Sequence, residues 1–165
     1  MTSKLYIASK PAVSEHLNPQ HMYLVYDQDG IENSGDELVI RGGPPGQTTG
    51  FTGYINIEIA RPILDSEDGP VSEEEGPYTV DDLPSVYARN FTLIEEGSTA
   101  DALWETMVEF AISLSSNENA EPGGVYSTGF TYAPTNSNSN STVASVMAAA
   151  GLDINDYRPV IGGDL

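Results

Sequence analysis

Histidine is scarce in this chain, and cysteine is absent, so covalent chemistry that uses a histidine base would need a hydroxyl nucleophile. His16 lies in a polar stretch, whereas His21 opens the apolar segment 21–26, which we predict to be a strand. A rigid strand holds an imidazole in the fixed position that a general base needs. His21 is therefore the better candidate for a base.

A hydroxyl that could act with this base lies near the other end of the chain. Ser139 belongs to the run Asn138-Ser-Asn-Ser141, which is typical of a helix start and precedes a helix predicted over 142–150. Free backbone N–H groups and the positive end of the helix dipole stabilise a developing oxyanion at such a place. The alternative is that Asn138 and Ser139 only cap the helix and that His21 is an ordinary strand residue.

The elements that must position these residues start with four predicted strands, at 4–8, 21–26, 37–41 and 54–60. Asp27-Gln-Asp-Gly30 suits a tight turn and predicts a hairpin between the second and third of them. The run 42–46 is rich in Gly and Pro and should end the sheet there. In the fourth strand Ile55, Ile57 and Ile59 share one face.

The second half of the chain predicts two helices and one more strand. Residues 65–82 read as an acidic surface loop, and a helix should start at Ser98, with Ser98 or Thr99 as its N-cap. A strand is expected at 125–133, and Gly151 should end the second helix. Together these elements predict a single α+β domain, 1–165, with an antiparallel sheet packed against two or more helices. The predicted core residues are Ile55, Ile57, Ile59, Leu103, Trp104, Met107 and Val108.

The order of these pieces resembles that of the circularly permuted papain-like proteins, which include lecithin:retinol acyltransferase-like and permuted NlpC-like groups. In those families a His on an early strand faces a Cys at the N-terminus of a late helix. The resemblance covers 21–41 and 132–150, and it places Ser139 where the family has its Cys. It implies a hydrolase or acyltransferase that acts on an amide or ester bond, with Ser139 as nucleophile, His21 as base and no cofactor.

A third polar group on the next strand orients the imidazole in those families, and the resemblance places Arg41 at that position. A guanidinium cannot accept the imidazole N–H, so Glu37, Glu32 or Asn33 could orient His21 instead. Arg41, beside Gly42 and Gly43, could bind a substrate carboxylate or pair with a surface carboxylate of the chain. Asn138 is a further candidate for an orienting or substrate-binding residue.

The net charge of the chain disfavours some classes of binding partner. With 25 acidic and 6 basic residues the net charge is −19, which disfavours direct binding to nucleic acid and to anionic membranes. We expect a small peptide, amide or ester substrate. The acidity also allows a catalytically inactive module that docks on a basic protein, or a mimic of DNA.

Neither a membrane span nor a signal peptide is evident, which favours a cytoplasmic location or export without a signal peptide. Two acidic segments, Asp27–Gly30 and Asp65–Gly69, cluster oxygen ligands without the spacing of a twelve-residue Ca²⁺ loop. The sequence therefore predicts no metal site.

Overall fold

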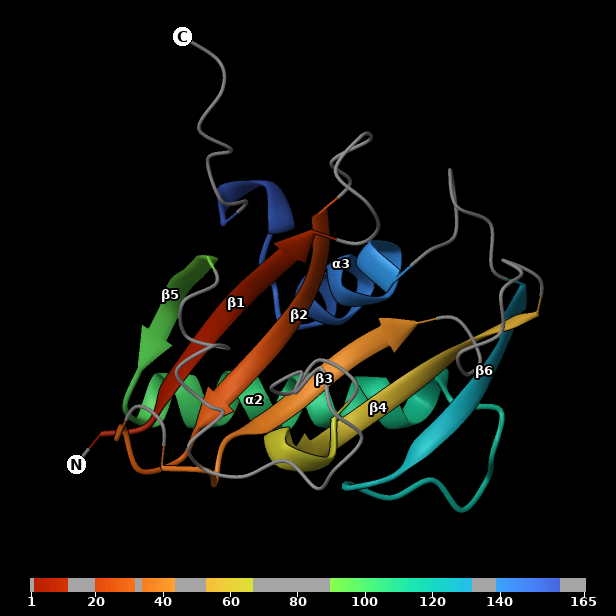
Figure 1. Ribbon diagram of the computed structural model, residues 1–165, viewed down its shortest axis with the longest axis horizontal. Coiled ribbons are helices and arrows are strands. Elements are labelled where there is room, and N and C mark those ends of the chain that lie inside the picture. The colour runs from red at the N-terminus through yellow and green to blue at the C-terminus, as the bar shows by residue number, and fades with distance from the viewer. Residues whose placement is uncertain are drawn as a thin grey trace, which may run out of the picture.

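Six strands form one antiparallel sheet in the order β5-β1-β2-β3-β4-β6 (Figure 1). The computed structural model describes residues 2–11, 20–31, 34–43, 53–66, 90–131 and 139–157. The strands are β1 (Lys4–Pro11), β2 (Gln20–Asp27), β3 (Leu38–Gly43), β4 (Tyr54–Pro62), β5 (Asn90–Glu96) and β6 (Val125–Thr131). The α+β prediction of an antiparallel sheet with helices is confirmed.

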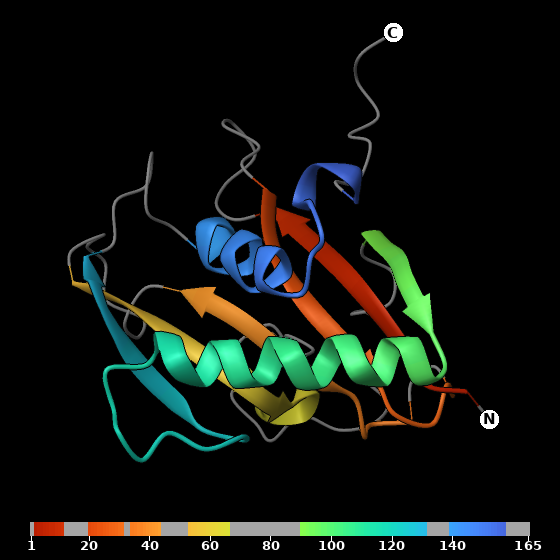
Figure 2. The same cartoon turned by 180° about the vertical axis from the view of Figure 1, so that it is seen from behind.

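Two helices, α2 (Ser98–Leu114) and α3 (Ser139–Ala149), cover the same face of the sheet (Figure 2). Two short 3-10 helices, η1 (Ile63–Asp65) and η3 (Ile154–Asp156), follow β4 and α3. No helix in the described ranges is long and apolar enough to cross a membrane.

The main core lies between the sheet and these helices because alternate strand residues turn their apolar side chains toward α2 and α3. It contains these buried residues: Leu5, Ile7, Met22, Leu24, Ile40, Ile57, Ile59, Ala60, Ile94, Ala100, Trp104, Met107, Ala111, Val143, Val146, Met147 and Ile154. The opposite face carries a second, smaller buried cluster, made of Tyr6, Ala8, Tyr23, Val25, Val39 and Ile63. Both faces of the central strands are therefore buried.

The predicted core is confirmed for Trp104 and Met107 and for the three isoleucines of β4. Leu103 and Val108 are only partly buried. The face of α2 that meets the sheet is formed by Ala100, Trp104, Met107 and Ala111, whose spacing of three and four residues leaves Leu103 and Val108 at its margins.

The end of β3 differs from the prediction that the sheet stops at Gly42. Gly42 and Gly43 continue the strand and pair with Ile57 and Asn56 of β4. The reason for a glycine at this point is the close approach of α3, which a larger residue would block. Residues 44–50 lie outside the described part of the chain.

The hairpin of β2 and β3 is confirmed, but its connection runs from 28 to 37 and is not a two-residue turn. β5, which pairs with β1 at the sheet edge, was not predicted. Its apolar residues do not alternate, because Phe91 packs with the second cluster, Ile94 packs with the main core and Leu93 is exposed.

Of the predictions about helix ends, the N-cap of α2 is wrong and the end of α3 is confirmed. The N-cap of α2 is Gly97 with no side-chain cap, in place of Ser98 or Thr99. Gly97 has a φ of 68°, which a glycine adopts without strain, and its N–H donates to Ser3 O at 2.8 Å. Gly151, with a φ of 79°, ends α3 as predicted, and the Leu152 N–H donates to Met147 O at 3.0 Å.

Candidate functional site

The β2–β3 ladder stops near the start of β2, and a side chain from the first turn of α3 bonds to β2 there. The β2–β3 ladder runs from the pair Tyr26 and Leu38 to the pair Leu24 and Ile40. The next residue of β2 with the same orientation, Met22, donates its main-chain N–H to Asn140 Oδ1 at 2.8 Å. We call this place, formed by Met22, Gly42 and Asn140, the β2–β3 fork.

A strand N–H lies in the plane of its sheet. Since Asn140 Oδ1 accepts from such a group, the Asn140 side chain reaches the sheet plane at the fork. The helix packs on one face of the sheet, and the side chain of its second residue bonds to the beginning of β2.

Gly42 allows this approach from the other side of the fork. A Cβ atom at Gly42 would lie 2.6 Å from Thr142 Oγ1 and 2.7 Å from Thr142 Cβ. Thr142 and Val143 are both buried. The first turn of α3 is thus held by a hydrogen bond to β2 and by close packing on β3.

The two predicted catalytic residues are chain neighbours of the residues that join at the fork. His21 lies in β2 opposite Lys10 of β1, directly before Met22, and Ser139 is the first residue of α3, directly before Asn140. Their side chains lie outside the described part of the structure. The backbone of each is described, and the fork joins their neighbours, which are 118 positions apart in sequence.

The alternation of β2 adds a constraint on position 21. Tyr23 and Val25 are buried on the face away from the helices, and position 21 has the same parity. Alternation therefore assigns position 21 to the face of the sheet opposite the one that α2 and α3 cover.

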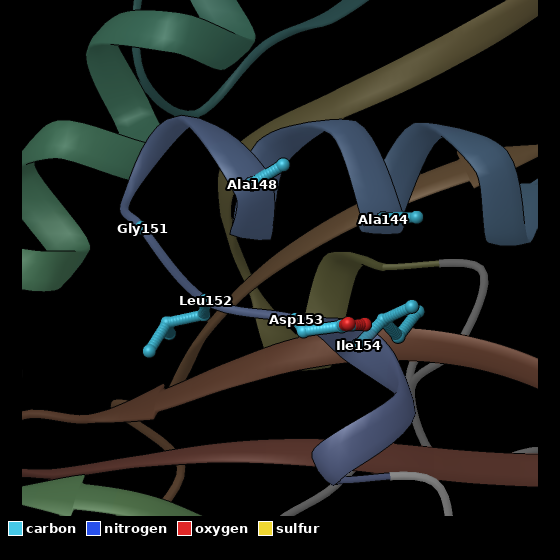
Figure 3. Close-up of a pocket in the computed structure, with 6 residues that line it drawn as sticks. All are labelled: Ala144, Ala148, Gly151, Leu152, Asp153 and Ile154. Atoms are coloured by element: carbon cyan, nitrogen blue, oxygen red, sulfur yellow. The ribbon is translucent and has the colours of Figure 1, made fainter.

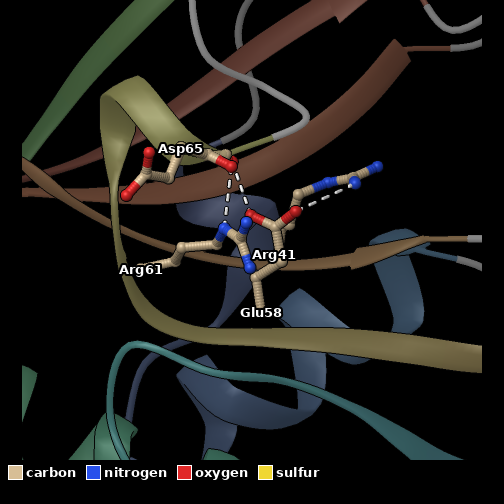
Figure 4. A network of polar contacts seen from close by, with 5 residues as sticks. Arg41, Glu58, Arg61 and Asp65 are labelled. Carbon is tan, nitrogen blue, oxygen red and sulfur yellow. Dashed lines mark hydrogen bonds and ion pairs between the residues drawn. The ribbon is translucent and has the colours of Figure 1, made fainter.

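Arg41 lies on this same face, as a buried cation with a buried partner. It is 8% exposed, and its Nη1 lies 3.5 Å from Oε1 of Glu58, which is 3% exposed (Figure 4). Ser66 Oγ donates to Glu58 Oε2 at 2.5 Å. At the other side of this network, Arg61 Nε donates to the main-chain oxygen of Asp65 at 2.7 Å.

The guanidinium of Arg41 lies over Gly43, because a Cβ atom at Gly43 would be 2.6 Å from Arg41 Nη2. The β2–β3 ladder ends at the pair Leu24 and Ile40, before it reaches Arg41. The placement of Arg41 near His21, which the resemblance implied, stays a prediction, and the guanidinium is already paired with a buried carboxylate. It offers no acceptor for an imidazole N–H.

The other candidate orienting residues are not brought to the fork. Glu37 precedes β3 at the opposite end of the hairpin, about 20 Å along β2 from His21. Its Oε2 accepts from the Gly35 N–H at 3.0 Å, and it is fully buried. Its position excludes an orienting role toward His21. Glu32, Asn33 and Asn138 lie outside the described residues.

A small pocket opens beside the first turns of α3. Its volume is about 180 Å³, and its walls combine apolar side chains from three other elements with hydroxyls of α3. The lining residues are Ile55, Leu114, Thr128, Phe130, Ser141, Thr142 and Ser145. It is the described cavity that lies next to the predicted nucleophile, and we call it the α3 pocket.

Two larger pockets contain fewer groups that could activate a substrate. One, of about 410 Å³, lies between α3 and η3 and has Asp153 as its only ionisable lining residue (Figure 3). Asp153 caps η3 by accepting from the Asn155 N–H at 2.9 Å. The other, of about 420 Å³, is a mainly apolar groove along α2 beside Trp104.

A carboxylate cluster lies at the far end of β2, away from the fork. Asp27, Asp29 and Asp36 each place a side-chain oxygen within 4.8 Å of the others. Burial, with the nearby charges of Glu37 and Asp29, raises the pKa of Asp27 to about 6, although a hydrogen bond from the Gly30 N–H acts in the opposite direction. The sequence prediction of no metal site considered only loop spacing. It did not consider that the strand ends would bring Asp36 back to Asp27.

No protein-family model, no curated protein and no solved structure matches the chain. The functional argument therefore depends on the geometry of the chain itself.

Proposed function

We propose that the chain is a hydrolase or acyltransferase of the permuted papain-like type that acts on an amide or ester bond. Ser139 is the nucleophile and His21 is the base. The observation that supports this proposal best is the hydrogen bond from Met22 N–H to Asn140 Oδ1, because it ties the residues next to the two candidates together. The antiparallel sheet with a late helix packed against its early strands agrees with the same proposal.

In the proposed reaction the His21 imidazole takes the proton of the Ser139 hydroxyl as Oγ attacks the substrate carbonyl. Main-chain N–H groups in the first turn of α3 stabilise the oxyanion that forms. Collapse of the tetrahedral intermediate releases the amine or alcohol, which receives the proton from the imidazolium. Water or a second acceptor then attacks the acyl-enzyme by the same steps, and Ser139 is regenerated.

The α3 pocket is the proposed binding place of the acyl group. Ile55, Leu114 and Phe130 provide apolar contact, and its volume of about 180 Å³ suits a short chain. The hydroxyls of Thr128 and Ser145 line the same pocket, but each already donates to a main-chain oxygen, of Ile55 and Ser141 respectively, so toward a substrate they act as acceptors. With a net charge of −19 on the protein, neutral and cationic substrates should bind better than anionic ones.

Labelling with a fluorophosphonate probe tests the native nucleophile. The wild-type chain should be labelled at Ser139, and both Ser139→Ala and His21→Ala should abolish the label. Ser113→Ala is the control, since Ser113 is an exposed serine of α2 outside the α3 pocket. Labelling that persists in Ser139→Ala, or a wild-type chain that is never labelled, would contradict the proposal.

A cysteine at position 139 distinguishes two explanations for weak labelling of the wild type: a serine that is a poor nucleophile in an intact site, and a position without an activating site. A thiolate near a base and a helix N-terminus has a lowered pKa and is alkylated faster than an ordinary thiol at neutral pH. Iodoacetamide should therefore modify Ser139→Cys at least tenfold faster than Ser113→Cys, and His21→Ala should remove the difference. Equal rates for the two thiols would show that no activating site exists at the fork.

A further inference from the structure

The carboxylate cluster at the far end of β2 is built from the last residue of that strand and from its connection to β3. Asp27 is fully buried, Asp29 is half-buried and Asp36 is exposed, and one oxygen of each lies within 4.8 Å of the others. Gln28 Nε2 donates to the main-chain oxygen of Asp36 at 2.8 Å, which holds Asp36 close to the end of β2. The cluster thus brings together the two ends of the connection between β2 and β3.

Asp27 supplies the observation that points to a ligand. Its Oδ1 accepts from the Gly30 N–H at 2.7 Å, whereas its Oδ2 is buried without a hydrogen-bond partner. A buried carboxylate oxygen without a donor is costly, and so is a second carboxylate beside it. A cation between these groups would remove both costs.

The nearby basic residue does not supply that cation. Lys4 is the partner of Asp27 in the β1–β2 register, yet the described side chains of these two residues form no ion pair. Fully buried Glu37 lies close to the same strand end and adds to the negative potential there. None of the described basic side chains therefore forms an ion pair with the three aspartates.

We propose that Asp27, Asp29 and Asp36 form a Ca²⁺ site that fastens the β2–β3 connection. All the ligands are carboxylate oxygens, which hard divalent cations prefer. Two oxygens bound to one Ca²⁺ can be up to roughly 5 Å apart, whereas Mg²⁺ requires every pair to lie within roughly 4.2 Å. Separations of at most 4.8 Å can be spanned by one Ca²⁺, and water completes the coordination. This site lies away from the fork and is independent of the proposed enzymatic function.

Calorimetric titration of the chelator-treated chain at physiological salt, with CaCl₂ and separately with MgCl₂, tests the site. We expect one saturable Ca²⁺ site with a Kd of about 10⁻⁴–10⁻³ M, as in exposed sites with few ligands, and weaker binding of Mg²⁺. Asp29→Asn should weaken Ca²⁺ binding at least tenfold, and Asp27→Asn should abolish it. Asp156→Asn, which removes the same charge from the exposed surface of η3, should leave the Kd unchanged.

Three results would overturn the proposal. Absence of saturable binding up to about 10 mM Ca²⁺ would exclude a site in the usual range of protein Ca²⁺ affinities. Equal binding by the wild type and Asp29→Asn would show that Ca²⁺ only screens the acidic surface, and tighter binding of Mg²⁺ than of Ca²⁺ would contradict the ion assigned. Because Asp29 is only half-buried, Asp29→Asn keeps the test valid even if Asp27→Asn fails to fold.

Discussion

The main-chain N–H of Met22 donates a hydrogen bond to Oδ1 of Asn140 at 2.8 Å, although the two residues are 118 positions apart. The bond satisfies a strand N–H at the point where β3 has separated from β2. It also fixes the first turn of α3 against the beginning of that strand. The Asn140 side chain thus supplies the acceptor that β3 does not offer to Met22, and it holds the residue next to the candidate nucleophile against β2.

Replacing Asn140 should show how much this bond contributes. Asn140→Ala leaves the Met22 N–H without its acceptor, and we expect the free energy of unfolding to fall by about 1–3 kcal/mol. Asn140→Asp keeps an acceptor and places a negative charge in the first turn of a helix, so it should lose much less. Denaturant melts of the two variants measure the difference, and a loss under about 0.5 kcal/mol for Asn140→Ala would show that the bond is not important for stability.

Substitution of Gly42 should lower the free energy of unfolding by an amount similar to that expected for Asn140→Ala. The Cβ of Gly42→Ala would lie 2.6 Å from Thr142 Oγ1, so α3 must move away from β3 or the core must distort. Overpacking of this kind costs about 1–3 kcal/mol. The same variant should slow alkylation of a Ser139→Cys thiol, because the helix N-terminus leaves the fork.

A second substitution tests whether the contact with Thr142 is the cause. Gly42→Ala combined with Thr142→Gly should recover part of the lost stability, even though a helical glycine costs about 1 kcal/mol. Denaturant melts of the single and double variants give this comparison. Additive losses would contradict the proposed contact.

The elements that position the site were largely predictable from local patterns. β2 and β4 were predicted because apolar residues are frequent or alternate along them, and α3 because polar capping residues precede an apolar stretch that ends at Gly151. β5 was missed because an edge strand buries few residues and its apolar residues occupy both faces. Its pairing with β1 is a long-range property.

The contacts of the site itself could not be read from the sequence. Whether Arg41 meets a surface carboxylate or Glu58 depends on the register of β3 and β4, which shifts between Val39 and Arg41. The approach of α3 to Gly42 depends on packing across the sheet. The sequence could not show that Arg41 is buried and paired with Glu58.

The fold should be sensitive to the loss of one partner of the buried pair Arg41 and Glu58. Glu58→Leu leaves a buried guanidinium without its carboxylate and should cost about 3–5 kcal/mol. The double variant Arg41→Met with Glu58→Leu removes both charges and should recover most of that loss. A double-mutant cycle from denaturant melts measures the coupling between the two residues.

Arg61→Met provides the control for this cycle. Arg61 lies in the same network but is partly exposed and binds a main-chain oxygen, so its replacement should cost less than about 1 kcal/mol (Figure 4). A loss for Glu58→Leu as small as that for Arg61→Met would show that the buried pair contributes little.

The pH dependence of stability should have a component from Asp101, at the start of α2. Its Oδ1 accepts hydrogen bonds from the Ser3 hydroxyl and, at 2.6 Å, from the Tyr26 hydroxyl. These bonds, with Ser3 as the larger contribution, lower the pKa of Asp101 below its usual value. A carboxylate with a lowered pKa in the folded state stabilises the fold above its unfolded pKa, and this stabilisation is lost as the pH falls through the folded pKa.

Removing either hydroxyl should therefore raise the pKa of Asp101 and reduce the loss of stability on acidification. We expect a larger rise for Ser3→Ala than for Tyr26→Phe, whose ring can keep its stacked contact with Trp104 at 5.1 Å. Carbon-detected NMR titration of the Asp101 carboxyl measures the pKa, and denaturant melts at neutral and acidic pH measure the stability. Tyr54→Phe, at an exposed tyrosine of β4, is the control and should leave the Asp101 pKa unchanged. An Asp101 pKa that is equal in the wild type, Ser3→Ala and Tyr26→Phe would show that these hydroxyls do not stabilise the carboxylate.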